Sequence, residues 1–209
     1  MNVLVIGAAG KLGSEVVKRA LSAGHKVTAF VHHAAEAHLR SGVRVIEGDS
    51  TDAAAIDNAV QDQNAVLDTL GGKTPYKETT LESTTAVNLV RSMERHGFKR
   101  LVVTSMLGEG DSKANTGFFY EHILMSTFLH GSTPDKALME TKVSGSNLDW
   151  SILRPAILTD GEATGHIRVF TPETGGTAHK ISRADVAQFM VDQLTSDTYL
   201  RQAVTIATS

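Results

Sequence analysis

Residues 1–23 constrain this chain most, because an apolar run, three spaced glycines and an amphipathic pattern follow one another directly. The last four residues of the segment 2–6 are all apolar, and such a continuous apolar run is typical of a strand buried in a parallel sheet. Gly7, Gly10 and Gly13 follow, and the pattern over 11–23 predicts a helix with one apolar face. Such glycines let the backbone of a turn lie close to a diphosphate. Free backbone amides at the start of the helix then stabilise the negative charge of that diphosphate. The order predicts a dinucleotide site, and the alternative is a turn that packs helix on strand without ligand.

The rest of the chain repeats the alternation of apolar runs with helical patterns. The predicted strands are 2–6, 26–31, 43–47, 64–69, 99–104, 149–154 and 202–207. The predicted helices are 11–23, 52–60, 79–96, 118–130, 134–147 and 182–195. Strands that alternate with helices form right-handed crossovers. We therefore expect an α/β fold, with a Rossmann-type, doubly wound parallel sheet and helices on both faces.

The whole chain, 1–209, fits one such domain. Between Pro155 and Ser182 the sequence becomes rich in glycine, so we expect a small hairpin or lid over about 156–181 as a C-terminal substrate-pocket segment. Ser182 followed by Asp185 predicts a helix N-cap with a negative charge in the first turn.

Composition excludes several classes of site and partner. The chain has no cysteine, which excludes disulfides, zinc–thiolate sites and thiol catalysis. A net charge of −3 with interspersed signs gives no electrostatic case for nucleic acid. No apolar run approaches the ~20 residues of a membrane span, and the first residues already form a strand rather than a signal peptide. The histidines lack metal-ligand spacing. We expect a cytoplasmic protein, a monomer or small homo-oligomer, that acts on a small molecule and holds no metal.

The second predicted strand bears on the choice of cofactor. Sites for NAD usually carry a carboxylate after that strand to bind the ribose, but here 26–31 ends in His32 and His33. A histidine can donate a hydrogen bond to a 2′-phosphate and gain charge beside it, which favours NADP over NAD. Solvated loop histidines are the alternative. Asp49 either accepts a bond from the adenine amino group or caps the helix that begins near Asp52.

Two further pairs of residues each have two interpretations. Leu70 and Gly71 follow the fourth strand, where a glycine lets the chain pass under a ribose or simply forms a turn. Arg154 and Arg183 are expected to anchor loops through carboxylates or backbone, and the alternative is contact with substrate.

The tyrosines bear on the type of reaction. A tyrosine acid works with a lysine four residues later, which lowers its pKa, yet none of Tyr76, Tyr120 and Tyr199 has a lysine at that spacing. Alcohol–ketone chemistry driven by such a dyad is therefore not expected. Ser105 ends the strand 99–104 at the edge where open sheets bind ligands, so it is the catalytic candidate, with a turn or helix cap as the alternative.

An aromatic group is the candidate wall of a substrate pocket. It consists of Phe118, Phe119 and Tyr120 on the predicted helix 118–130, together with Phe170 in the glycine-rich segment. For the helical residues, packing in the core is the alternative.

Four segments, taken in order, resemble one known family. They are Gly7–Gly13, Gly48–Asp49, Leu148–Pro155 and Ile181–Ala187. Together they resemble the atypical short-chain dehydrogenase/reductases of the NmrA-like group, in the branch that contains biliverdin reductase B, also called flavin reductase.

This resemblance implies a set of cofactor contacts. They are Gly7, Ala9, Gly10, Lys11, Leu12 and Gly13 around the pyrophosphate, Asp49 and Ser50 beside the adenine, Leu70 and Gly71 at the nicotinamide-side ribose, Thr104 and Ser105 beneath the nicotinamide, and Pro155, Ala156 and Ile157 beside its carboxamide. His32 stands where the family usually has an arginine for the 2′-phosphate. Ala156 stands where biliverdin reductase B has a histidine, so a proposed acid of that enzyme is absent.

The expected function follows from these residues and this resemblance. Hydride transfer is the cofactor's own chemistry, so an acceptor that is protonated by solvent needs little beyond alignment. We expect an NAD(P)H-dependent oxidoreductase that transfers hydride to a flavin, quinone or similar conjugated acceptor without a Tyr–Lys dyad. The alternative is a non-catalytic, NADP-binding redox sensor of the NmrA-like type.

Overall fold

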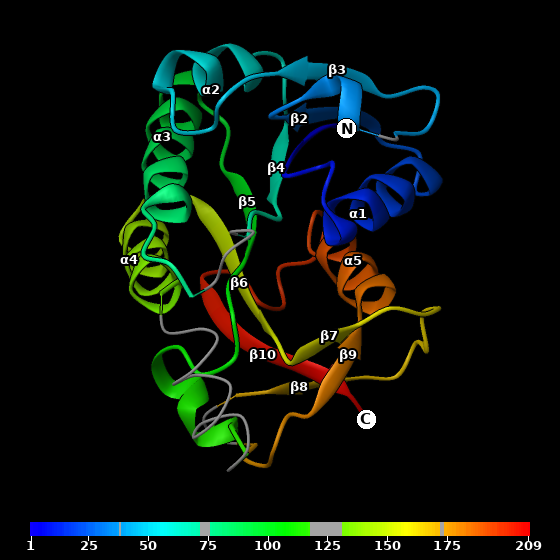
Figure 1. Ribbon diagram of the computed structural model, residues 1–209, viewed down its shortest axis with the longest axis vertical. Helices are drawn as coiled ribbons and strands as arrows, with labels where there is room; N and C mark the ends of the chain where they lie inside the picture. Colours follow the sequence, from blue (N-terminus) through cyan, green and yellow to red (C-terminus); the bar gives the residue numbers. More distant parts are fainter. Residues whose placement is uncertain (38, 72–75, 118–130, 172–173) are drawn as a thin grey trace.

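The computed structural model describes residues 1–37, 39–71, 76–117, 131–171 and 174–209 (Figure 1). Within them, the main sheet has eight strands in the order β3-β2-β1-β4-β5-β6-β10-β8. The strands are β1 Asn2–Ile6, β2 Lys26–Val31, β3 Arg44–Glu47, β4 Ala65–Asp68, β5 Arg100–Thr104, β6 Asp149–Pro155, β8 Ile167–Phe170 and β10 Gln202–Thr208. Neighbours pair in parallel except β8, which is antiparallel to β10. The expected Rossmann-type fold is confirmed.

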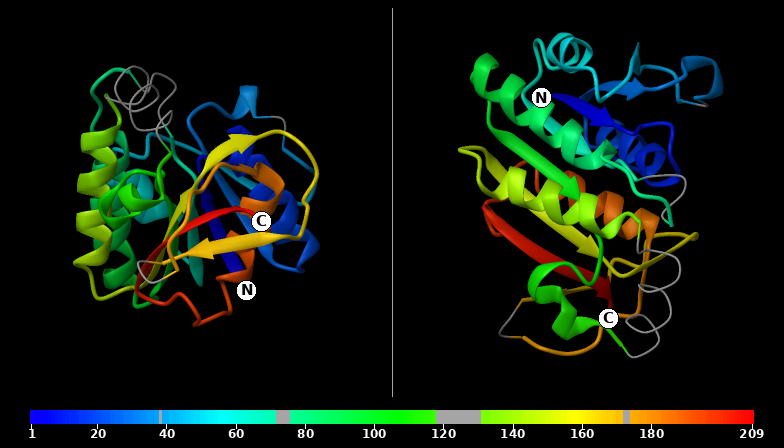
Figure 2. Two further views of the ribbon diagram at one scale, coloured as in Figure 1. Left: turned by 90° about the horizontal axis from the view of Figure 1, so that it is seen from below. Right: turned by 60° about the vertical axis from the view of Figure 1, so that its left-hand side comes forward.

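Helices cover both faces of this sheet (Figures 1 and 2). One face carries α1 and α5, and the other carries α2, α3 and α4. Their bounds, with those of two short 3-10 helices, are α1 Lys11–Ser22, α2 Ala53–Ala59, α3 Leu81–His96, α4 Thr133–Ser144, α5 Arg183–Asp192, η1 Ala34–Glu36 and η2 Gly110–Asn115. The helix predicted at 118–130 lies outside the described residues.

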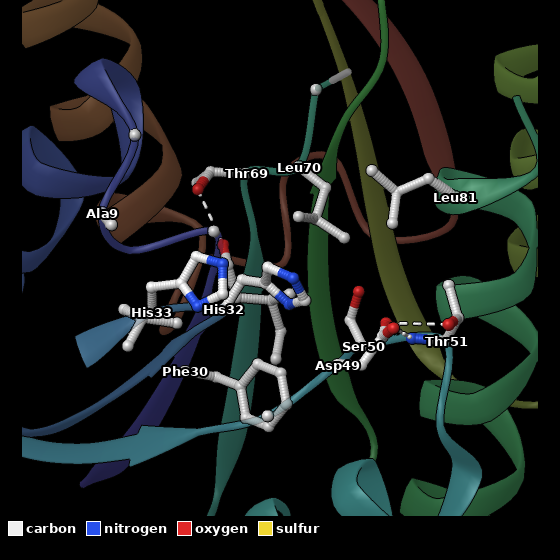
Figure 3. A pocket seen from close by; sticks show the side chains of 16 residues that line it. Ala9, Phe30, His32, His33, Asp49, Ser50, Thr51, Thr69, Leu70 and Leu81 are labelled. Carbon is white, nitrogen blue, oxygen red and sulfur yellow. Dashed lines mark hydrogen bonds between the residues drawn. The ribbon is translucent and has the colours of Figure 1, made fainter. Parts of the chain in front are cut away.

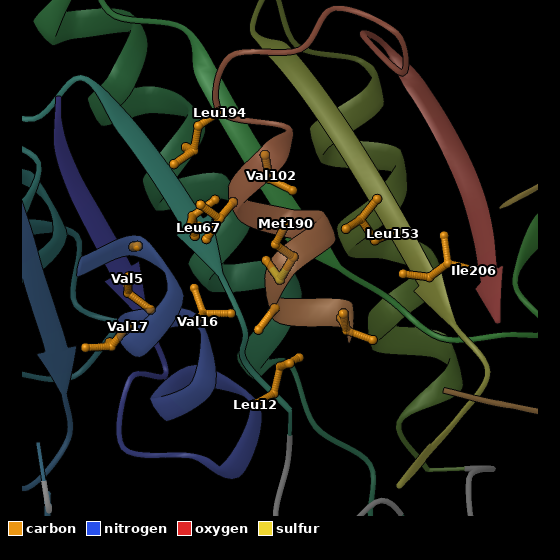
Figure 4. Packing of buried hydrophobic residues seen from close by; sticks show 14 of the residues in the cluster. Val5, Leu12, Val16, Val17, Leu67, Val102, Leu153, Met190, Leu194 and Ile206 are labelled. Atoms are coloured by element: carbon orange, nitrogen blue, oxygen red, sulfur yellow. The ribbon is translucent and has the colours of Figure 1, made fainter. Parts of the chain in front are cut away.

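Each face of the sheet has its own hydrophobic core. Between the sheet and α1 and α5, Val5, Val16 and Met190 are fully buried in one cluster (Figure 4). Leu89 and Met93 of α3 belong to the second cluster, on the other face. Burial on both faces explains why the strands read as continuous apolar runs.

The segment after β6 differs from the predicted hairpin. β7, Ile157–Thr159, pairs in parallel with β9, Lys180–Ser182, while β8 joins the main sheet beside β10. The prediction of a hairpin over 156–181 is therefore wrong. The open edge of β10 offers unpaired backbone groups, and β8 satisfies them.

The helix cap predicted at α5 is confirmed, and it also fixes the preceding loop. The backbone amide of Asp185 donates to Ser182 Oγ over 2.9 Å. The Asp185 carboxylate accepts hydrogen bonds from the backbone amides of Thr164 and Gly165, at 2.9 and 3.0 Å. This one side chain thus ties the β7–β8 connection to the start of α5.

The order of the strands fixes where a ligand can bind. From β1 the chain winds outward through β2 and β3, and then returns to build β4, β5 and β6 on the other side of β1. Ile6, at the end of β1, is paired with Phe30 of β2 and Asp68 of β4. The carboxyl ends of β1 and β4 therefore meet at a topological switch point, where open α/β sheets form their ligand crevice.

Candidate functional site

A cleft of about 640 Å³ lies at this switch point (Figure 3). Residues at the carboxyl ends of β1, β2, β3 and β4, together with Leu81 at the start of α3, form its walls. Of the predicted cofactor residues, it brings together Gly7, Ala9, Gly10, His32, Asp49, Ser50, Leu70 and Gly71.

The glycine turn leads directly from β1 into α1. Gly7 has φ +74°, a left-handed conformation that glycine adopts without steric cost, and the amide of Gly10 donates to its carbonyl over 2.9 Å. A Cβ at Gly13 would lie only 2.2 Å from that same carbonyl oxygen. Gly10 is the N-cap of α1 and provides no side-chain cap. Because the first amides of a helix need an acceptor, this uncapped start facing the cleft suits an anion.

Three of the residues predicted to wrap the pyrophosphate are not among those that line the cleft. Leu12 packs into the core beneath α1, and Gly13 permits the close contact of helix and turn. Lys11 Nζ lies 3.2 Å from Asp160, which also pairs with Arg183 at 2.6 Å. For these three positions only a backbone role at the pyrophosphate remains a prediction.

The two histidines lie at the end of the cleft formed by β2 and β3. Both are exposed, and their ring centroids are 4.3 Å apart. Asp49 faces the same space, and its Oδ1 accepts the amide and hydroxyl of Thr51 at 2.8 and 2.7 Å. These bonds hold the pKa of the Asp49 carboxyl below its usual range, with a smaller effect of His32. Asp52 is the N-cap of α2, so the interpretation of Asp49 as that cap is wrong.

A buried polar contact fixes the back wall of the cleft. Thr85 of α3 donates its hydroxyl to Ser50 Oγ over 2.8 Å, and Asn88 Nδ2 donates to the Ser50 carbonyl over 3.1 Å. Nearby, a Cβ at Gly48 would lie 2.9 Å from the ring of Phe30, so only a glycine at this position leaves enough room for the ring in the cleft wall.

The cleft also contains residues that sequence reasoning missed. They are Ile6, Phe30, Val31, Thr51, Thr69 and Leu81. His33 and Gly48, named above only beside His32 and Asp49, also line it. Apart from Leu81, the missed residues lie within four positions of the end of a strand, and this position was the available signal.

The residues expected at the nicotinamide lie at or just beyond the carboxyl ends of β5 and β6, outside the lining of this cleft, and Ile157 begins β7. Ser105 donates its amide to the carbonyl of Leu153 over 2.7 Å, and its Oγ is buried with no partner among the described residues. The hydroxyl therefore makes neither of the alternative caps within that part of the chain. Thr104 Oγ1 donates to the carbonyl of Asp68 over 3.2 Å. Pro155 ends β6, followed by buried Ala156 and exposed Ile157.

The predicted aromatic wall is only partly described. Phe118, Phe119 and Tyr120 lie outside the described residues. Phe170 is 3% exposed, belongs to the core that α1 and α5 cover, and carries the guanidinium of Arg168 over its ring at 4.6 Å. Phe170 thus fills the core and does not line the cleft.

The two arginines anchor loops through carboxylates, as expected. Arg154 is buried and donates to both carboxylate oxygens of Glu140, at 2.9 and 2.7 Å, and also to Asp111. Its partners come from α4 and η2, so it joins both elements to the end of β6. Arg183 pairs with Asp160.

A buried group of charges lies behind the cleft, on β4, α3 and α4. Lys136 Nζ is 3.3 Å from Glu82, and Asp135 accepts the backbone amides of Glu82 and Ser83 at 2.9 Å each. Burial raises the pKa of Asp68 to about 6, against the opposing effects of the Leu70 amide and of Lys136. Sequence reasoning did not identify this group.

Within the described ranges, no three histidine or acidic side chains gather as metal ligands. No helix in that part of the chain has both the length and the apolar character needed to cross a membrane.

Comparisons with known proteins agree with this geometry. A family model described as NAD(P)H-binding matches residues 7–197. The protein YMR090W of Saccharomyces cerevisiae is 27% identical over 208 residues, which cover 93% of this chain and 87% of that protein. The structure of ChuY, an anaerobillin reductase from Escherichia coli O157:H7, is 26% identical with a TM-score of 0.81, and covers 100% of this chain and 97% of that one.

A third relative shares the fold at lower identity. It is a short-chain dehydrogenase/reductase from Veillonella parvula, solved in complex with NADP, with 17% identity and a TM-score of 0.81 over 99% of this chain and 94% of that one. At this identity the likeness concerns the fold alone.

Proposed function

This chain belongs to the NAD(P)H-binding family, and on that premise we propose that it is an NAD(P)H-dependent reductase of a flavin, a quinone or a similar conjugated acceptor. The observation that carries the proposal is the glycine turn that opens into the uncapped start of α1, beside a cleft at the switch point. Free amides and the helix dipole at that start favour a diphosphate. The cleft extends from there toward Asp49 and the histidines, as an adenosine would require.

The proposed reaction uses no Tyr–Lys dyad, since no tyrosine of the chain precedes a lysine at that spacing. When bound, a reduced nicotinamide would supply the hydride, and the acceptor would take up that hydride together with a proton from solvent. The protein has to hold donor and acceptor in line and exclude water. Ser105 is the proposed catalytic group, because its buried Oγ lacks a partner among the described residues and can hydrogen-bond near the nicotinamide.

We further propose that NADP is preferred over NAD. The end of β2 carries His32 and His33 in place of a carboxylate, and both line the cleft. Among the described residues that line the cleft, Asp49 is the one acidic residue, and its Oδ1 accepts two hydrogen bonds from Thr51. A histidine can donate to a 2′-phosphate, whereas a carboxylate at the end of β2 would repel it.

The identity of the acceptor rests on chemistry and on one relative. A conjugated acceptor that accepts hydride directly fits a site without a dedicated acid. ChuY, 26% identical, is an anaerobillin reductase, so anaerobillin belongs among the acceptors to be tested. We propose that the protein works in the cytoplasm as a monomer or small homo-oligomer, with a small molecule as its only partner and without a membrane or nucleic acid.

A second candidate function is a non-catalytic sensor of the NADP state. The missing dyad and Ala156, at the place of a histidine in biliverdin reductase B, favour it. Both candidates require the same cleft, and they differ only in turnover.

One assay separates the two candidates. Purified protein is mixed with NADPH or NADH and a panel of FMN, riboflavin, quinones, anaerobillin and dichlorophenolindophenol, and loss of reduced-cofactor absorbance is followed. If the protein is a reductase, at least one acceptor should make it oxidise NADPH faster than it does without an acceptor. The variant Ser105→Ala should then lower kcat about tenfold or more. Tight cofactor binding without turnover for any acceptor would support the sensor instead.

A further inference from the structure

A buried acid ends β4, one of the strands whose carboxyl ends form the walls of the cleft. Asp68 is the last residue of β4 and is 4% exposed. Its Oδ1 accepts the backbone amide of Leu70 over 3.0 Å. Leu70, labelled in Figure 3, and Gly71 line the cleft directly, so the carboxyl group that accepts the Leu70 amide lies next to the cleft wall.

The residues of this turn are hydrogen-bonded to different partners. Both the amide and the hydroxyl of Thr69 donate to the carbonyl of Ile6, at 3.0 and 2.7 Å. The carbonyl of Asp68 accepts the hydroxyl of Thr104. Residues 68 and 69 are therefore fixed to the neighbouring strands β1 and β5. Leu70 follows these two residues, and the Asp68 carboxyl accepts a hydrogen bond from its amide.

Asp68 belongs to a buried group of charges whose other members come from α3 and α4. Lys136 of α4 is the cation that acts on it, and the same ammonium group pairs with Glu82 of α3. Asp135 caps the start of α3. All four charged side chains are less than a tenth exposed, with three acids for one cation. Leu81, next to Glu82, lines the cleft, so the group connects two of its walls.

We propose that Asp68 is a positioning residue, whose carboxylate holds the turn 69–71 in the shape that receives the dinucleotide, so that cofactor affinity depends on its charge. The inference rests on the proposed function, since it assumes that the cleft binds the cofactor. A charged acceptor makes a stronger hydrogen bond to an amide than a neutral one does. The turn is thus held most firmly when Asp68 is ionised.

The effect should be visible as a pH dependence of binding. Because burial raises the pKa of Asp68 to about 6, the carboxylate forms above this pH and is lost below it. Burial also raises the pKa of Glu82, an effect that Lys136 opposes and Asp135 reinforces. Affinity for the dinucleotide should therefore fall as the pH is lowered from 7.5 to 5.

The test compares two variants by titration with NADH, which has no 2′-phosphate to titrate. Asp68→Asn keeps an acceptor for the Leu70 amide but carries no charge, whereas Asp68→Ala removes the acceptor. At pH 7.5, Asp68→Ala should raise the Kd about tenfold and Asp68→Asn about threefold. His32 and His33 are present in every protein, so the ratio of wild-type to Asp68→Asn affinity isolates residue 68.

The expected result is a ratio of wild-type to Asp68→Asn affinity that declines from pH 7.5 to 5. A constant ratio, or an Asp68→Ala variant that binds NADH as the wild type does, would overturn the inference. Asp68→Asn keeps the test decisive if Asp68→Ala does not fold. Should the wild type bind neither NADH nor NADPH at any pH, the proposed function itself would fall, and the inference with it.

Discussion

The Cβ position of Gly13 lies 2.2 Å from the carbonyl oxygen of Gly7, so the first turn of α1 touches the loop that precedes it. Gly13→Ala must therefore push the helix start away from the turn. We expect a loss of about 1–3 kcal/mol in the free energy of unfolding and a Kd for NADPH at least about tenfold higher. Urea unfolding and calorimetric titration measure these two changes.

Gly71 provides the control for stability, because a Cβ there would meet nothing within 4 Å. Gly71→Ala should leave the free energy of unfolding within about 0.5 kcal/mol of wild type. Equal stability of the Gly13 and Gly71 variants would show that helix and turn are not in close contact.

Arg154 should matter far more for stability than Arg183. Arg154→Ala leaves the largely buried carboxylate of Glu140 without its bidentate partner, which should cost about 3–5 kcal/mol. Arg183→Ala removes a pair whose acid, Asp160, is 69% exposed and screened by solvent, so its effect on stability should be far smaller than that of Arg154→Ala. Chemical denaturation of both variants gives the comparison, and similar losses would contradict it.

His32 is predicted to discriminate between the two nicotinamide cofactors. His32→Asp replaces a donor by a carboxylate, which should raise the Kd for NADPH about tenfold and change that for NADH by less than about threefold. His33→Ala is the control variant at the neighbouring position. We expect it to change the ratio of the Kd for NADPH to the Kd for NADH less than His32→Asp does. Unchanged NADPH binding in His32→Asp would mean that the histidine does not read the phosphate.

The ionised Asp68 should lower the stability of the fold at neutral pH, because its pKa of about 6 in the folded protein lies above the usual value for an aspartate. Such a group stabilises the fold fully below its unfolded pKa, and this contribution is lost as the pH rises through the folded pKa. Two pKa units correspond to about 3 kcal/mol. Asp68→Asn should therefore gain stability relative to wild type between pH 4 and 7.

Thermal unfolding of both proteins across that range measures the effect. A difference in Tm that does not change with pH would show that Asp68 does not titrate in this window. A gain in stability together with altered cofactor binding would identify Asp68 as a residue retained for function at a cost in stability.

The parts of the fold that depend on local patterns were predictable. The apolar run of β1, the glycines that follow and the periodicity of α1 are contiguous, so the sequence alone locates the turn at Gly7. The cap of α5 is equally local, since Ser182 and Asp185 are three residues apart. These features need no knowledge of which strands are neighbours.

The rest depends on contacts between distant segments. The place of β8 beside β10 follows from an open sheet edge, which a glycine-rich stretch does not indicate. The buried charges around Asp68 come from three elements that only the folded chain brings together. Phe30 enters the cleft wall because Gly48, from the next strand, leaves room for its ring.

The most direct test is a crystal structure of the protein with NADPH. The account predicts the diphosphate of the nucleotide at the start of α1, within hydrogen-bond distance of backbone amides between Gly7 and Gly13, with its adenosine toward Asp49. A structure in which the nucleotide binds elsewhere, or in which a side chain occupies this corner, would contradict it.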